Sequence, residues 1–108
     1  VYPLTAQISV TNVNLTIQGG YPAGATGTDL SGYNPTANQT IINGNGFGIL
    51  RTAVGYNRNL VFRGFTLTEG NATNGSVFYA ESSTSGTFLF ENLRCINNWA
   101  QNGAFFFT

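Results

Sequence analysis

Short runs in which apolar and polar residues alternate make up most of this chain. The runs hold about four to six residues, are closed by Gly or Asn, and leave straight-chain helix formers scarce. A period of two predicts β-strands, and Gly-Gly and Asn-Gly pairs predict tight corners between them. The clearest predicted strands are Ala6–Val10, Val13–Gln18, Leu60–Arg63, Phe65–Thr68 and Phe88–Glu91. We therefore predict an all-β chain without helices.

An internal repeat of 28 residues joins the last two segments of the chain. Residues 60–80 superpose on residues 88–108 without a gap and share five identical positions, among them Phe62 with Phe90. Self-similarity at a fixed period of this size is typical of proteins that stack one repeat on the next. We expect Phe62 and Phe90 to lie side by side in parallel strands.

Shorter spacings separate similar residues earlier in the chain. Ile41-Ile42 stands twenty residues before Val61-Phe62, and Asn14–Thr16 stands twenty-five before Gln39–Ile41. A period of 20 to 28 residues with three short strands and no helix predicts a β-solenoid, from which the insertion Tyr21–Ala37 stands off as a loop. We expect a single domain, residues 1–108, of about four to five coils. A sandwich of antiparallel hairpins is the competing fold.

Ionic residues are rare in this chain. Only 7% of residues are charged, the formal net charge is zero, and there is no His and a single Cys. Such a chain has no electrostatic attraction to nucleic acid or anionic lipid, no imidazole for catalysis or metal binding, and no internal disulfide. No apolar run is long enough to cross a bilayer. We expect no nucleic-acid partner, no membrane insertion, and neither a metal nor another cofactor.

The acidic residues are the candidates for catalysis, and they are Asp29, Glu69, Glu81 and Glu91. Hydrolysis of a glycosidic bond needs two carboxyl groups about 5–9.5 Å apart. The repeat instead places Glu69 opposite Asn97, and Arg63 opposite Glu91. We expect Arg63 and Glu91 to form a surface ion pair, Asp29 to be a turn residue, and the chain to carry no catalytic site.

A motif with a family resemblance follows the second copy of the repeat. The run from Cys95 to Phe105 resembles the repeat of polymorphic outer-membrane-protein-like β-helices, which reads Phe-x-x-Asn-x-Ala followed by Gly-Gly-Ala-Ile. Asn98 and Ala100 fall on the Asn and Ala of that motif, and Gly103-Ala104 on its Gly-Ala, while its Phe, first Gly and Ile are replaced. The resemblance implies a right-handed parallel β-helix in an extracellular or cell-surface setting. It implies no reaction.

Several single residues are candidates for surface contacts. Trp99 lies in an Asn-rich corner, where its ring either stacks on a sugar or, as we favour, covers the corner of the core. Cys95 replaces an inward aromatic of the motif, which predicts a buried, unreactive thiol. In a eukaryote the Asn-x-Ser/Thr sequons would be glycosylation sites, with Asn71 the first choice. The sequons begin at Asn14, Asn38, Asn71 and Asn74.

The last residues stop in the middle of a predicted coil. Ala104–Thr108 holds Phe105, Phe106 and Phe107, without the polar cap that closes natural solenoids. An open terminal strand exposes backbone groups and apolar side chains. We expect this segment to be covered by further coils of a longer chain or by another copy of the protein.

Together these features predict an extracellular or cell-surface β-helix module with a structural or adhesive role. Glycans and neighbouring chains are its expected partners, since the surface is rich in amides and hydroxyls. Two alternatives remain open. The chain is a fragment of a carbohydrate-active β-helix enzyme, either a polysaccharide lyase or a glycoside hydrolase, or it is a subunit of an extracellular filament that stacks end to end.

Overall fold

Short strands and tight corners form along the chain, as the alternation predicts. The structure, a computed structural model, describes residues 1–22, 24–25, 31–103 and 105–107. These residues form thirteen β-strands and no helix, so the described chain is all-β. The turn expected at Asp29 lies outside the described residues, as do the motif residue Ala104 and the terminal Thr108.

The strands form four sheets, and every pair of neighbouring strands in them is parallel. Sheet A contains β1 (Tyr2–Pro3), β4 (Thr40–Asn43), β7 (Phe65–Thr68) and β11 (Arg94–Ile96). Sheet B contains β2 (Ile8–Val10), β5 (Leu50–Thr52), β9 (Phe78–Ala80) and β13 (Phe106–Phe107). Sheet C contains β3 (Leu15–Gln18), β6 (Asn59–Arg63) and β10 (Thr87–Glu91). Sheet D contains β8 (Asn71–Asn74) and β12 (Trp99–Asn102).

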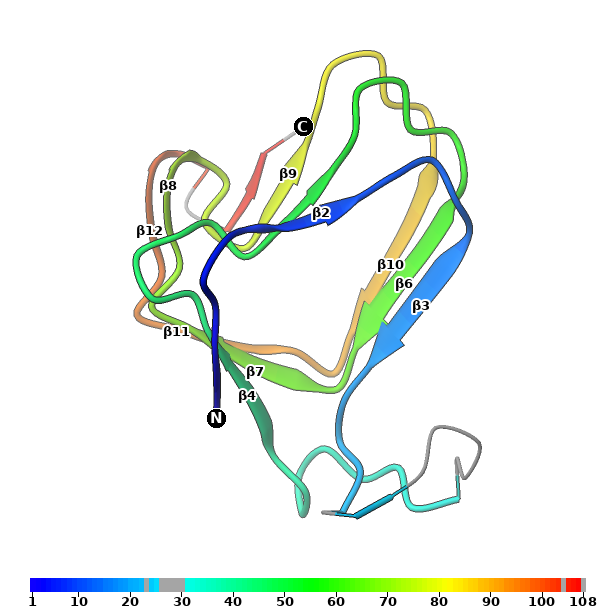
Figure 1. The fold of residues 1–108 in the computed structure, drawn as a ribbon, viewed down its shortest axis with the longest axis vertical. Coiled ribbons are helices and arrows are strands. Elements are labelled where there is room, and N and C mark those ends of the chain that lie inside the picture. Colours follow the sequence, from blue (N-terminus) through cyan, green and yellow to red (C-terminus); the bar gives the residue numbers. More distant parts are fainter. Residues whose placement is uncertain (23, 26–30, 104, 108) are drawn as a thin grey trace.

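The chain visits the sheets in a repeating order, from C to A, D and B and then back to C, and Figure 1 shows the sheets arranged around a common interior. Antiparallel hairpins are absent from the described residues, so the sandwich alternative is wrong. A complete pass, such as residues 59–86, holds four strands rather than three. No sheet has more than four strands. The described residues therefore make between three and four passes, fewer than the expected four to five, because the insertion takes up chain length.

The 28-residue repeat is confirmed by the pairing of strands. Phe62 pairs with Phe90 across β6 and β10, and Phe78 pairs with Phe106 across β9 and β13. Leu50 of β5 precedes Phe78 by the same spacing and pairs with it. The repeat is thus a true structural unit, in which equivalent residues lie directly above one another.

The two shorter spacings are wrong. Ile42 pairs with Leu67, 25 residues on, and Leu15 pairs with Leu60, 45 residues on. The cause is the unequal length of equivalent connections, since residues 19–39 join β3 to β4 whereas Gly64 alone joins β6 to β7. A long insertion moves the partners of the earlier strands away from any constant spacing.

An apolar core fills the space between the sheets. Aromatic rings dominate it, and the Phe78 ring lies with its centroid 5.1 Å from that of Phe88 and 4.9 Å from that of Phe90. The buried Tyr56 hydroxyl donates a hydrogen bond to the Val13 carbonyl oxygen at 2.7 Å, and burial raises the pKa of this phenol. The buried apolar residues are Val10, Ile42, Ile49, Leu50, Tyr56, Leu60, Phe62, Phe65, Leu67, Val77, Phe78 and Ala80.

Left-handed backbone recurs at equivalent corners of successive passes. Residues with a positive φ come in pairs that are 28 positions apart, because the same turn has to be made in each pass. Gly and Asn tolerate this conformation best, which explains why they close the predicted strands. The pairs are Gly55 with Ser83, Gly64 with Asn92, Glu69 with Asn97, and Gly75 with Gly103.

Glu69 is the residue least suited to its corner, and we expect Glu69→Asn to stabilise the protein. Its φ of 56° matches the 55° of Asn97. A left-handed conformation costs an ordinary L-residue about 1–2 kcal/mol, and Asn relieves part of that cost, so a gain of roughly 0.5–1 kcal/mol in the free energy of unfolding is expected. Urea denaturation measures it. Glu69→Gln removes the same charge without favouring this backbone, and an equal gain from Gln would contradict the explanation.

The described part of the insertion is fastened to the corner between sheets C and A. The Asn34 amide donates to the Gly20 carbonyl oxygen at 2.7 Å, and the Asn92 side-chain amide donates to the Tyr33 hydroxyl at 3.0 Å. The Arg63 guanidinium lies over the Tyr33 ring, 5.1 Å from its centroid. In Figure 1 the insertion stands off below the frame of sheets, as expected for a loop outside the core.

Candidate functional site

The described glutamates lie apart from one another, and two of them face arginines. Arg63 and Glu91 form the predicted ion pair, with Nη1 and Oε1 2.9 Å apart. Arg51 and Glu81 approach more loosely, at 3.8 Å. Within the described residues, no group of three or more His, Cys, Asp or Glu side chains is placed to hold a metal ion. Both pairs are partly exposed, so each contributes at most about 1 kcal/mol to stability.

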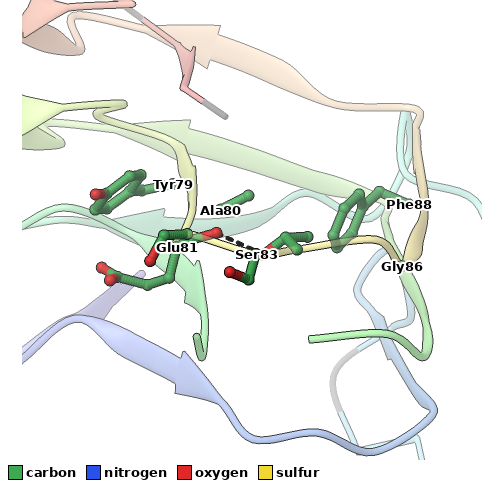
Figure 2. A pocket seen from close by; sticks show the side chains of 8 residues that line it. Tyr79, Ala80, Glu81, Ser83, Gly86 and Phe88 are labelled. Carbon is green, nitrogen blue, oxygen red and sulfur yellow. Dashed lines mark hydrogen bonds between the residues drawn. The ribbon is translucent and has the colours of Figure 1, made fainter. Parts of the chain in front are cut away.

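An open pocket lies at the corner where β9 turns into β10 (Figure 2). Its volume is about 540 Å³, and hydroxyl groups dominate its polar lining, with the Phe88 ring at one end. The Thr84 hydroxyl donates to the Glu81 carbonyl oxygen at 2.6 Å, which holds the turn around the strained Ser83. The only carboxylate that lines the pocket belongs to Glu81. The described pocket therefore offers no pair of carboxyl groups for acid–base catalysis.

Trp99 begins β12 and lies on the outer surface of sheet D. Its side chain is 60% exposed, so it does not cover the corner of the core as the sequence suggested. The reason is the alternation of the strand, in which the half-buried Ala100 lies opposite Ala72 and turns its neighbour Trp99 outward. Asn71, the partner of Trp99 in β8, is exposed as well. The ring is therefore free to contact a ligand beside an amide side chain.

Cys95 is half-buried in sheet A, where it pairs with the fully buried Leu67. Its side chain packs against the core, and burial raises the pKa of the thiol. A raised pKa leaves less of the nucleophilic thiolate at neutral pH. The structure thus agrees with the expected unreactive thiol, although the burial is only partial.

The sequon asparagines differ in how far their side chains are engaged. Asn14 Oδ1 accepts from the Asn59 amide at 2.9 Å, and Asn74 Oδ1 accepts from Asn102 Nδ2 at 2.9 Å. Asn38 Nδ2 donates weakly to the Gly32 carbonyl oxygen at 3.4 Å. The exposed Asn71 side chain makes no hydrogen bond to any described residue. Asn71 therefore offers the most accessible amide of the four, and its glycosylation stays a prediction.

Asn98 has a role that the sequence did not reveal. Its Oδ1 accepts from the Gly70 amide at 2.8 Å, and its Nδ2 donates to the Leu67 carbonyl oxygen at 2.9 Å. One side chain thus satisfies two backbone groups of the preceding pass. The signal available in the sequence was the 28-residue spacing, which sets Asn98 on Gly70, a residue with no side chain to fill the space.

The end of the stack nearest the C-terminus exposes aromatic residues. Phe105 and Phe106 are 47% and 46% exposed, and β13 is paired on one side only, with β9. The Phe106 ring also contacts that of Phe90, with centroids 4.9 Å apart. The side chain of Phe107 is outside the described part of the structure. The covering of this edge by further coils or by another copy stays a prediction.

Comparisons with protein-family models, with curated proteins and with solved structures found no match to this chain. A search of the described residues for a helix long and apolar enough to span a membrane found none.

Proposed function

We propose that the chain folds as a right-handed parallel β-helix and acts as an extracellular or cell-surface structural module that contacts glycans. Parallel pairing in all sheets, the recurring order of the sheets and the 28-residue register support the β-helix. The position of Asn98, which the family motif shares, supports it further because this side chain joins adjacent passes. The extracellular setting rests on the resemblance and on the scarcity of charge.

The observation that carries the glycan contact is the exposure of Trp99. Indole has a broad apolar face, and an exposed ring of this size beside polar groups is typical of a binding surface. Asn71, its partner in the adjacent strand, offers both donors and an acceptor to sugar hydroxyls. A neutral sugar residue would stack on the ring while the amide bonds to its hydroxyl groups. No charge on the ligand is needed.

Titration with neutral oligosaccharides tests this proposal. Trp99 is the only Trp in the chain, so a change in intrinsic tryptophan emission reports on this residue alone. We expect at least one of the cello-, chito-, manno- or galacto-oligosaccharides to shift the emission maximum. Calorimetry should then show a loss of roughly tenfold or more in affinity for Trp99→Ala, since stacking on an aromatic ring contributes about 1–3 kcal/mol in a comparable contact.

Leu89→Ala is the matched control. Leu89 is a 45% exposed apolar residue on β10 of sheet C, so its removal takes similar apolar surface from another face. Binding by this variant should equal that of the unaltered protein. Unchanged Trp99 emission with every oligosaccharide, or equal weakening by the two substitutions, would contradict a glycan contact at Trp99.

A further inference from the structure

A groove lies between sheet A and the described part of the insertion. Pro35, Thr36 and Gln39 line it from the insertion, and Thr66 and Arg94 line it from neighbouring positions of β7 and β11. Its volume is about 260 Å³. That is less than the roughly 300–1,000 Å³ of pockets for drug-sized ligands, so the groove fits a single small ring.

The insertion side of the groove is held in place by several contacts. Asn34 anchors it, because its backbone amide donates to Gly20 O at 2.7 Å and its Oδ1 accepts from the Ala37 amide at 3.0 Å. Tyr33 fastens the same segment to Asn92, which itself lines the groove. A preformed groove loses little conformational entropy on binding.

The polar groups of this groove are largely unused by the protein. The side chains of Thr36, Gln39 and Thr66 make no hydrogen bond to any described residue. The exposed Arg94 makes no ion pair with a described residue, whereas Arg51 and Arg63 each face a glutamate. The groove therefore combines one free cation with several free hydroxyl and amide groups.

We propose that this groove binds one sugar residue that carries a carboxylate. The Arg94 guanidinium pairs with the carboxylate, and such a charge-assisted contact is both strong and directional. Thr36, Gln39, Thr66 and Asn92 supply donors and acceptors for the ring hydroxyls. The carboxylate of an acidic peptide would satisfy Arg94 but leave these groups without partners, so the lining favours a sugar acid. This site is separate from the Trp99 contact and takes a different class of sugar.

A matched pair of ligands tests the proposal on isotope-labelled protein by NMR titration. Methyl β-D-glucuronide and methyl β-D-glucoside share a ring and differ in the carboxylate. We expect the glucuronide to bind roughly tenfold more tightly, with chemical shift changes at Thr66, Asn92 and Arg94, because hydrogen bonds to charged groups contribute about 1.5–3 kcal/mol. Arg94→Gln should abolish the difference between the two ligands. Arg58→Gln removes a charge from another exposed arginine without an ion pair among the described residues, and should preserve the difference.

Three results would overturn the proposal. The first is equal affinity for the two sugars, and the second is equal weakening by Arg94→Gln and Arg58→Gln, which would indicate a general charge effect. The third is binding of N-acetylglutamate amide as tight as that of the glucuronide, which would indicate an acidic-peptide site. Trp99→Ala should leave glucuronide binding unchanged, so this proposal and the neutral-glycan proposal fail independently.

Discussion

Replacing Phe78 with alanine is expected to lower the free energy of unfolding by about 3–5 kcal/mol, the usual loss for a buried Phe. Phe78 is 1% exposed and lies on β9, which is paired on both sides, with β5 and β13. Its ring contacts those of Phe88, Phe90 and Phe106, with centroids 5.1, 4.9 and 6.3 Å away. Removing the ring leaves a cavity that fixed ladders on either side cannot close by collapse.

Urea denaturation followed by circular dichroism measures this loss. Domains of this size are stable by about 5–15 kcal/mol, so Phe78→Ala will be partly unfolded if the parent lies at the low end. Phe78→Leu keeps most of the apolar volume and should show a smaller loss in a fully folded protein. Leu89→Ala, on the exposed face of β10, should stay within about 0.5 kcal/mol of the parent. A Phe78→Ala loss no larger than that of Leu89→Ala would mean that the core is not centred on Phe78.

Asn98→Ala is expected to lower the free energy of unfolding by about 2–4 kcal/mol. The substitution leaves the Gly70 amide and the Leu67 carbonyl oxygen without their partners. Both residues are buried, and each unsatisfied buried group costs about 1–3 kcal/mol. The loss should be local at first, because the two groups belong to one corner between β7 and β8.

Amide hydrogen exchange separates this effect from a general loss of stability. In Asn98→Ala the Gly70 amide should exchange faster than the ladder amides of β6, which keep their bonds. Asn102→Ala is the control, since its Nδ2 bonds only to Asn74 Oδ1 in an exposed pair, and its loss should be below about 0.5 kcal/mol. If the two alanine variants were equally stable, Asn98 would not be the clamp between adjacent passes.

The fold was predictable where equivalent segments have equal length. Residues 60–80 and 88–108 make the same corners with the same number of residues, so a direct superposition identified Phe62 and Phe90 as ladder partners. The partners of β3 and β4 could not be found in this way. Leu15 pairs with a residue 45 positions away because the insertion separates it from the next pass, and no local pattern reports that distance.

The corners were only partly predictable for a different reason. Asn and Gly mark left-handed positions because they tolerate a positive φ, and Gly64 and Asn92 follow this rule. Glu69 and Ser83 adopt the same backbone without the composition that signals it. Their conformation is imposed by the neighbouring pass, and tertiary constraint of this kind leaves no mark on the residue itself.

The candidate surfaces depend on which way a side chain turns, and the sequence decided this poorly. Trp99 was favoured as a cover for the core because its size suggested burial, yet the inward position belongs to Ala100. Arg94 attracted no attention in the sequence, since its importance comes from the insertion, which approaches sheet A from far along the chain. The ion pair of Arg63 with Glu91 was predictable because both lie within the undisturbed repeat.

The parallel pairing of strands has a consequence for how the chain folds. The shortest strand pairing in the described residues joins positions 25 apart, as in Thr40 with Phe65, and the longest joins positions 45 apart. No hairpin is available as an early nucleus, so a loop of this size must close before the first ladder forms. Proteins dominated by such distant contacts fold slowly, in milliseconds to seconds, with unpaired strands exposed meanwhile. The near absence of charge removes the repulsion that would keep those unpaired strands of different molecules apart, so concentration during refolding will decide the yield.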